Sequence, residues 1–274
     1  MSNNNTPQEF ETILASYGFN ITTPINPDGK FHRFHERGGK AGNLDGYYRY
    51  VDGQIPFAIF GSWRTGCQYR WYAGDRTKLT SADRRELKQI ETEAAKRAEA
   101  IKIERQHYAS WRGQKIWAKA QPADPMHPYL VRKGVRSFGL RQKGDNLVIP
   151  FYADGKLTTL QFIHPDGTKR WLSCGKKKTA CYRLGMPSDT VCIAEGYATG
   201  ASIYQAKGYA TFIAGDAGNL RWVAEVVRHA LPHAKIIICA DNDDATSGNP
   251  GVKKATEAAA AVGGLLAIAG DYDA

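Results

Sequence analysis

The clearest pattern in the chain begins after Asp189, where short apolar runs alternate with longer amphipathic stretches. The apolar runs read as strands, and they cover Thr190–Ala194, Ala210–Ala214, Lys235–Ala240 and Leu265–Ala269. The stretches between them have helical spacing, and they cover residues 197–208, 220–231 and 251–262. Strands that alternate with helices of about 12 residues predict a parallel α/β sheet. In such a sheet, ligands bind beyond the carboxyl ends of the strands.

The first part of the chain follows other patterns. Residues 7–18 fit a short amphipathic helix with Thr6 as its N-cap. Residues 31–74 alternate aromatic and polar side chains between glycine turns, which is typical of a small antiparallel β module. A charged, proline-free segment then predicts one long, exposed helix from Ser81 to about residue 120. Hairpin turns of the Asp-Gly type separate the next predicted strands, at 147–152, 157–163 and 169–172.

These patterns divide the 274 residues into four regions, and the charge differs among them. We predict an N-terminal aromatic and basic β module, a helical linker, a basic α+β subdomain and a C-terminal α/β domain, at residues 1–78, 79–122, 123–188 and 189–274. The net charge is +10, but residues 81–190 carry 22 basic and 11 acidic side chains, whereas residues 191–274 carry 6 and 9. A basic middle suits a polyanion such as a nucleic acid, and an acidic end suits a cation.

Composition excludes several classes of protein. With 42% hydrophobic and 23% charged residues the chain is typical of a globular protein, and it has no apolar run that could span a membrane. The N-terminus lacks the basic and apolar regions of a secretory signal. The five cysteines form no Cys-x-x-Cys pair, which disfavours a zinc ribbon and indicates reduced thiols. We therefore expect a cytoplasmic protein that uses no zinc and has no membrane partner.

Acidic residues follow three strands of the predicted sheet, at the point where each strand ends. Glu195 follows one strand, Asp241 and Asp243 follow another, and Asp271 and Asp273 follow the last. Carboxylates placed close together repel one another unless a hard cation lies between them, so the arrangement favours Mg²⁺ or Mn²⁺. Each acid taken alone has a plainer interpretation, as a helix N-cap or part of an Asx turn.

The order and spacing of these acids resemble the Toprim signature, which is a Glu-Gly after the first strand and an Asp-x-Asp after a later one. The two motifs read Ile193-Ala194-Glu195-Gly196-Tyr197 and Cys239-Ala240-Asp241-Asn242-Asp243. Toprim domains occur in DnaG-type primases, type IA and type II topoisomerases, OLD-type nucleases and recombination proteins of the RecR type. The resemblance covers about residues 188–274.

The block before this domain resembles the basic subdomain of DnaG-type primases. Residues 148–157 read V-I-P-F-Y-A-D-G-K-L and residues 169–173 read K-R-W-L-S; three lysines at 176–178 and the sequence Y-R-L-G at 182–185 follow. Residues 129–274 are therefore similar to a primase catalytic core. The upstream part resembles the Toprim primases of plasmids, phages and integrating elements, which are often the front of a primase-helicase.

This resemblance implies a DNA primase that makes short primers on single-stranded DNA from nucleoside triphosphates, for replication or transfer of a mobile element. It implies Glu195 as the general base or a metal ligand. Asp241 and Asp243 become ligands of Mg²⁺ or Mn²⁺, with Asp271 and Asp273 as a second, weaker pair. A replicative helicase, in the same chain or separate from it, is an expected partner.

Basic residues of the middle region are the expected contacts to DNA or to nucleotides. By resemblance, Lys169 and Arg170 lie beside the template groove, and the run Lys176, Lys177 and Lys178 faces the metal site, although such a run also suits a solvated loop. Other basic side chains could extend a phosphate track, and these are Arg132, Lys133, Arg136 and Arg141. In the loop at residues 215–219, Asn219 either helps to face a triphosphate or caps the next helix.

The N-terminal module interleaves aromatic rings with basic side chains, a combination that suits single-stranded nucleic acid. We select Trp63 and its neighbour Arg64 as candidate template contacts, in place of the zinc ribbon that DnaG-type primases carry. The rings also have a plainer interpretation, as the core of a small β module.

Two departures from the family keep other functions open. DnaG-type primases usually have an Asp four residues after the motif Glu, where this chain has Thr199, and their zinc ribbon is missing. One alternative is a single-stranded-DNA-binding or helicase-recruiting module with a vestigial Toprim site, and another is a Toprim nuclease. A type IA topoisomerase is disfavoured because no room remains for its tyrosine-bearing domains. The chain stops directly after the last acidic pair, so the resemblance implies a longer protein that can carry a helicase domain.

Overall fold

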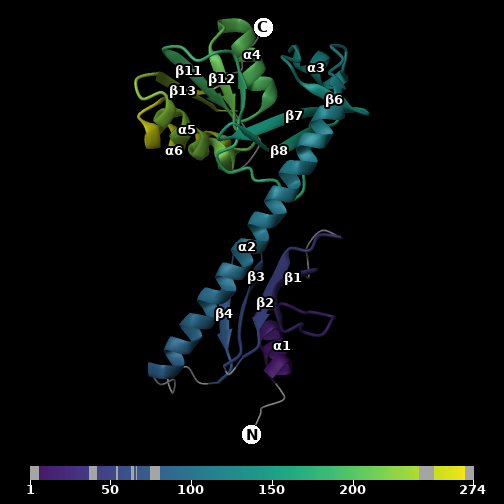
Figure 1. The fold of residues 1–274 in the computed structure, drawn as a ribbon, viewed down its shortest axis with the longest axis vertical. Coiled ribbons are helices and arrows are strands. Elements are labelled where there is room, and N and C mark those ends of the chain that lie inside the picture. Colours follow the sequence, from purple (N-terminus) through teal and green to yellow (C-terminus); the bar gives the residue numbers. More distant parts are fainter. Residues whose placement is uncertain are drawn as a thin grey trace. The chain divides into compact units, whose positions relative to one another are not determined.

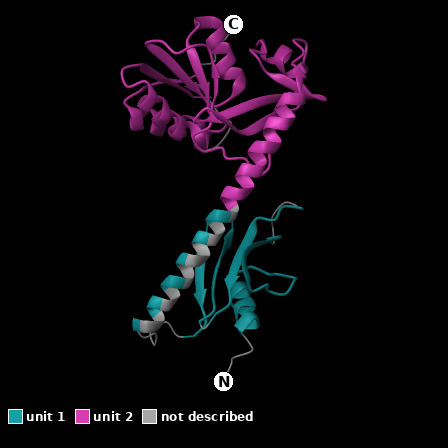
Figure 2. Ribbon diagram, in the orientation of Figure 1, with its two compact units in different colours: residues 1–101 teal, residues 102–274 magenta. Residues whose placement is uncertain are grey.

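The computed structural model describes residues 6–36, 42–53, 55–62, 65, 67–74, 81–240 and 250–268. It divides the chain into two compact units, unit 1 at residues 1–101 and unit 2 at residues 102–274 (Figure 2). This division falls inside the long helix, and the four regions expected from the sequence stay a prediction.

Unit 1 contains an antiparallel sheet against which a short helix packs (Figure 1). The strands lie in the order β1-β2-β3-β4, with bounds Asp28–Phe34, Gly46–Val51, Phe57–Ser62 and Gln68–Tyr72. Helix α1 (Thr6–Ser16) places Phe10 against the rings of four sheet residues, Tyr48, Tyr50, Phe60 and Trp71, with ring centroids 5.3–6.1 Å apart. The predicted antiparallel module is confirmed, and these rings form its core. Thr6 is the first helical residue, where we expected the cap.

Helix α2 (Ser81–Lys119) is one continuous element that begins in unit 1 and ends in unit 2. In unit 2 its buried face packs Ile116 and Trp117 against β7 and β8, in a cluster with Leu157 and Leu160. A Cβ on Gly113 would lie 2.9 Å from the Leu157 side chain, so the helix approaches the sheet closely at that point. Nowhere in the described parts of the chain does a helix combine the length and the apolar character that crossing a membrane requires.

The first sheet of unit 2, here called the basic sheet, is antiparallel. Its strands lie in sequence order, with bounds β5 Gln121–Pro122, β6 Arg141–Lys143, β7 Asn146–Ala153, β8 Lys156–Ile163 and β9 Lys169–Trp171. The short helix α3 (Pro128–Lys133) precedes β6. Its cap is His127, which is buried: Nδ1 accepts from the Tyr129 N–H, and Nε2 donates to the carbonyl oxygen of Asp145. The cap fixes the helix that carries Arg132 and Lys133.

The second sheet of unit 2, here called the parallel sheet, has the order β10-β12-β11-β13-β14. Its strands are β10 Tyr182–Leu184, β11 Thr190–Ala194, β12 Ala210–Ile213, β13 Lys235–Ala240 and β14 Leu265–Ile268. Strands β11 to β14 run parallel, and β10 is antiparallel to β12. The predicted mixed α/β fold with a parallel sheet is confirmed, and β10 is an edge strand that the sequence pattern did not predict.

Helices cover both faces of the parallel sheet (Figure 1). Helices α5 (Leu220–Ala230) and α6 (Pro250–Val262) share one apolar core with β11 and β13. Helix α4 (Tyr197–Lys207) packs on the other face, where Tyr197 and Ala201 join a core that also contains residues of α3 and β7. The parallel sheet and the basic sheet of unit 2 are therefore built around a shared core.

Backbone contacts also join the two sheets. Tyr152 on β7 and Cys181, next to β10, exchange two backbone hydrogen bonds of 2.9 and 3.0 Å. Gly215, just after β12, has a φ of +85°, and a Cβ there would lie 2.5 Å from the Trp171 ring of β9. Gln161 on β8 donates to the carbonyl oxygen of the same glycine at 3.0 Å. This junction sets the basic sheet against the carboxyl ends of β11 and β12.

Candidate active site

The carboxyl ends of β11 and β12 lie side by side, and Glu195 follows directly. In the parallel register Ala194 pairs with Ile213, and the Gly215 N–H donates to the Glu195 carbonyl oxygen at 2.8 Å. Gly196 is then the N-cap residue of α4, with an extended φ of −101°. The short turn therefore holds Glu195, half-buried, at the edge of the sheet where ligands of α/β folds bind.

A pocket opens beside this turn, and cations from α3 and β9 line it. It has a volume of about 350 Å³, and its walls come from α3, the turn before β9, the strand β9 and the first turn of α4. The lining residues are Tyr129, Arg132, Lys133, Asp166, Gly167, Lys169, Gly196, Ala198 and Thr199. Three residues predicted to contact DNA or nucleotides, Arg132, Lys133 and Lys169, thus line one pocket next to the Toprim-like Glu-Gly turn.

Local hydrogen bonds hold the walls of this pocket. Arg132 Nη1 donates to the carbonyl oxygen of Pro165 at 3.0 Å, and its guanidinium lies over the Tyr129 ring at 5.9 Å. The Thr168 N–H, followed by smaller contributions from His164, lowers the pKa of Asp166. The pocket consequently contains one ionised carboxylate among three cations, and its net charge attracts an anion.

The three-lysine run of residues 176–178 is attached to the parallel sheet. Lys177 Nζ lies 2.9 Å from an oxygen of Asp216, the residue after Gly215, and it also sits over the Trp171 ring at 5.3 Å. Lys178 Nζ lies 3.5 Å from the centre of the Trp222 ring on α5. The run therefore lies over the end of β12, close to the edge that carries Glu195, although Lys177 and Lys178 remain exposed.

Asn219 anchors the loop that carries the three lysines, a role that neither of our two interpretations anticipated. It occupies the N-cap position of α5, but no side-chain capping bond forms there within the described residues. Its buried amide donates to the carbonyl oxygens of Ala180 and Ala214 at 2.8 and 2.9 Å, and its oxygen accepts from the Thr179 N–H at 3.0 Å. The sequence indicated only the preference of asparagine for N-cap positions, and this preference does not predict the hydrogen bonds that Asn219 makes.

Other predicted contacts lie away from the pocket. Arg170 alternates with Lys169 and Trp171 along β9, so its side chain points to the opposite face of the strand. Arg141 donates to the carbonyl oxygen of Trp117 at 2.6 Å and covers that ring, which ties β6 to α2. Arg136 lies over Phe138, and its carbonyl oxygen accepts from the buried Tyr197 hydroxyl at 2.7 Å. Burial raises the pKa of Tyr197, so this donor stays protonated.

The predicted metal ligands other than Glu195 lie outside the described residues, and these are Asp241, Asp243, Asp271 and Asp273. β13 ends at Ala240, whose neighbour Cys239 pairs with Ala194, so the described sheet ends at the residue before Asp241. In the described ranges no three His, Cys, Asp or Glu side chains gather in a way that could hold a metal. The carboxylate chemistry of the predicted set fits Mg²⁺ or Mn²⁺.

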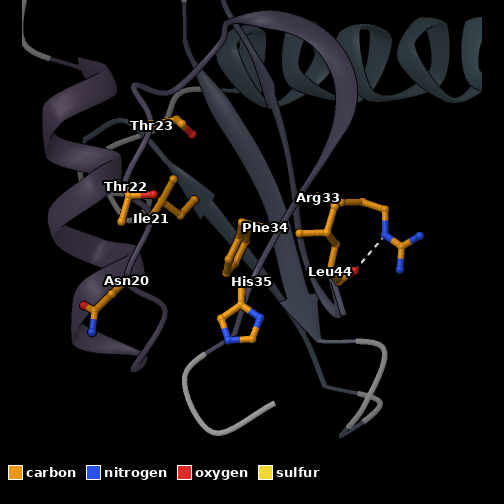
Figure 3. A pocket seen from close by; sticks show the side chains of 8 residues that line it. All are labelled: Asn20, Ile21, Thr22, Thr23, Arg33, Phe34, His35 and Leu44. Atoms are coloured by element: carbon orange, nitrogen blue, oxygen red, sulfur yellow. Dashed lines mark hydrogen bonds between the residues drawn. The ribbon is translucent and has the colours of Figure 1, made fainter. Parts of the chain in front are cut away.

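Unit 1 contains a separate open pocket of about 630 Å³ between the residues after α1 and the end of β1 (Figure 3). Two of its polar side chains are held by the backbone: Arg33 Nε donates to the Leu44 carbonyl oxygen at 2.8 Å, and His35 Nδ1 lies 2.9 Å from the carbonyl oxygen of Asn43. The predicted template contacts Trp63 and Arg64 lie outside the described residues.

Comparison with known proteins defines the class of the C-terminal domain. Residues 189–267 match the Toprim domain family, and this stretch of the chain is a Toprim domain. The match begins one residue before β11 and includes the Glu-Gly turn at the pocket.

The chain as a whole is similar to the DNA primase TraC of Escherichia coli, with 38% identity over 283 residues. That alignment covers 94% of this chain and 26% of TraC. A second DNA primase TraC from the same species is 34% identical over 254 residues, which cover 86% of this chain and 17% of that protein. The chain therefore spans about a quarter of the length of these relatives, or less.

Two solved structures match this chain at low identity. The DnaG primase catalytic domain bound to single-stranded DNA is 10% identical, with a TM-score of 0.43, over 61% of this chain and 71% of that one. The DnaG catalytic core is 12% identical, with a TM-score of 0.36, over 57% and 66%.

Proposed function

We propose that this chain is the catalytic part of a DNA primase, which makes short primers on single-stranded DNA by metal-dependent nucleotidyl transfer. The observation that carries the proposal is the pocket beside Glu195, where Arg132, Lys133 and Lys169 face the edge of a Toprim sheet. Nucleotidyl transfer requires phosphate charge to be held next to carboxylates. Three cations line this pocket, and Glu195 directly precedes its lining residue Gly196. The similarity to DNA primases named TraC supports DNA as the template.

In the proposed reaction the 3′-hydroxyl of one nucleotide attacks the α-phosphate of the next, and pyrophosphate leaves. Arg132, Lys133 and Lys169 bind phosphate oxygens, and the N–H groups at the start of α4 add to the same field. Glu195 accepts the proton of the attacking hydroxyl or serves as a metal ligand. Lys177 and Lys178 sit beside the end of β12, where they can neutralise further phosphate groups.

The proposed cation site consists of Glu195, Asp241 and Asp243, with Asp271 and Asp273 as a second pair. Mg²⁺ or Mn²⁺ bound there would offset the phosphate charge and favour ionisation of the attacking hydroxyl. We further propose that the primers serve replication or transfer of a mobile element in the cytoplasm, and that a replicative helicase is a partner.

The test is synthesis from unlabelled single-stranded DNA, labelled nucleotides and Mg²⁺ or Mn²⁺. We expect short products from the wild-type chain and a loss of at least about a hundredfold in Glu195→Gln. Glu225→Gln is the matched control, because Glu225 is a partly exposed glutamate on α5 that pairs with Arg221. Products that persist in Glu195→Gln would contradict the proposed site, and metal-dependent cutting of the DNA would indicate the nuclease.

One observation favours a second function, a single-stranded-DNA-binding or helicase-recruiting module with a vestigial Toprim site. Thr199, which stands where DnaG-type primases usually have an Asp, lines the pocket itself. A threonine supplies no charge to a cation. If the wild-type chain binds DNA but makes no product with either metal, this second function is the better description.

A further inference from the structure

Helix α2 has two different faces in unit 2, between Lys102 and Lys119. One face is buried, with Ala109 only 1% exposed and Gly113 against Leu157. Positions three and four residues apart share a helix face, so Tyr108, Trp111, Arg112 and Lys115 lie together on the other face. We call these four residues the aromatic face of α2. In Figure 1 this part of α2 runs along β7 and β8.

Two large rings on the aromatic face are open to solvent. Tyr108 is 60% exposed and Trp111 is 48% exposed. Their ring centroids are 5.6 Å apart and the ring planes differ by 24°, so the rings are stacked on the surface of the helix. Two stacked rings that are open to solvent present a flat aromatic surface that a planar partner can cover.

Cations flank both rings. Lys115 Nζ lies 4.1 Å from the centroid of Trp111, and the Arg112 guanidinium carbon lies 5.9 Å from that of Tyr108. Across residues 102–119 the helix carries five basic side chains and one acidic side chain, Glu104. The face therefore combines π surfaces with positive charge, and its partner must supply flat rings together with negative charge.

We propose that the aromatic face of α2 binds single-stranded DNA, with bases stacked on Tyr108 and Trp111 and phosphates held by Arg112 and Lys115. Bases stack on aromatic side chains whatever their sequence, and neighbouring cations follow the backbone. The four positions span about 10 Å along the helix, which is room for about two nucleotides. Paired bases in a duplex are already stacked, so the rings select single strands. The choice of DNA rests on the proposed function; the stacking geometry does not.

The experiment measures binding of a labelled oligothymidine by fluorescence anisotropy, without nucleotides or divalent metal. We expect Trp111→Ala to weaken binding about tenfold, and Tyr108→Ala with Trp111→Ala together about fiftyfold. Trp111→Phe keeps a ring and should retain most of the affinity. Tyr209→Ala is the matched control, because Tyr209 is a 40% exposed tyrosine in the Toprim domain, outside this face.

The charge component has its own measurement. Arg112→Gln with Lys115→Gln removes two phosphate contacts, so the slope of log affinity against log salt should fall by about 1.4. Circular dichroism checks that each variant stays folded, which we expect because all four side chains lie on the outer face of α2.

Several results would overturn the inference. Wild-type affinity in the folded double alanine variant would do so, and so would an equal loss in Tyr209→Ala. Duplex DNA bound as tightly, with the same dependence on the two rings, would exclude stacking. Because Glu195→Gln leaves this face intact, it should bind DNA normally, so failure of primer synthesis and failure of this binding face are separate results.

Discussion

The acidic and the basic residues proposed for the site are held in unit 2 in different ways. In the parallel sheet, Glu195 follows a strand whose register is fixed by backbone hydrogen bonds on both sides. By contrast, Arg132 comes from the short helix α3 and Lys177 from the loop after β9, and their positions depend on a few side-chain contacts to the rest of unit 2. The position of Glu195 in the proposed site is therefore set by the topology of the sheet, and the positions of Arg132 and Lys177 by particular contacts that single substitutions can remove.

The substitution with the largest expected effect is Gly215→Ala, at the junction between the two sheets of unit 2. The positive φ already disfavours a side chain, and the added Cβ would push against the Trp171 ring. We expect the free energy of unfolding of unit 2 to fall by about 3 kcal/mol, measured by urea denaturation. Gly155→Ala is the control, because its φ is +71° but nothing lies within 4 Å, and it should cost about 1 kcal/mol. Equal costs would mean that the Trp171 contact is unimportant.

The next largest effect should come from Asn219→Ala, which removes the side-chain hydrogen bonds that anchor the loop carrying Lys176, Lys177 and Lys178. Loss of the amide leaves the buried carbonyl oxygens of Ala180 and Ala214 without this donor, at a cost of about 2 kcal/mol. Hydrogen exchange at the Thr179 amide should speed up, while amides of β11 and β13 should change only with global stability. Asn219→Asp keeps the acceptor for Thr179 but removes the donors, so a stable Asp variant would refute this account.

The smallest effect is a pH dependence at the contact between β10 and the loop before β6. Burial raises the pKa of Tyr182 to about 12, and its hydroxyl donates to the carbonyl oxygen of Phe138. The raised pKa stabilises the protein fully below pH 10, and this contribution is lost as the pH rises from 10 to 12. At pH 11 the loss should be about 1 kcal/mol.

Tyr182→Phe isolates that contribution. The variant lacks the hydrogen bond and should be less stable at pH 8, but its stability should fall less between pH 9 and pH 11 than that of the wild type. Parallel pH curves for the two proteins would show that Tyr182 does not titrate in this range.

Much of the parallel sheet could be predicted from the sequence, because buried parallel strands are short apolar runs with clear ends. The bounds of β11 and β13 coincide with the predicted runs, Thr190–Ala194 and Lys235–Ala240. The three-residue strands β6 and β10 were missed, since a strand this short has almost no periodic pattern of its own. The equally short β9 was predicted because an Asp-Gly turn precedes it. Their pairing depends on neighbours that are distant in the sequence.

The basic residues were found by charge, but charge does not say where a side chain points. Period-two alternation along β9 could have separated Lys169 from Arg170, because neighbouring strand residues face opposite sides. Lys177 and Asp216 could not be paired from the sequence, since 38 residues and a whole β-α-β passage lie between them. The sequence did not point to Tyr108 and Trp111, because the mixed charges of their helix indicated only that the helix is exposed.

The antiparallel strand β10 has a practical consequence for work with fragments. It lies at residues 182–184, upstream of the stretch that matches the Toprim family, yet it pairs with β12 as part of the same sheet. A recombinant Toprim fragment cut at residue 189 would keep the pairing of β12 with β11 but leave the other edge of β12 unpaired, and such bare edges promote aggregation. A fragment intended for expression should therefore begin before Cys181, so that the edge strand is carried with the sheet it protects.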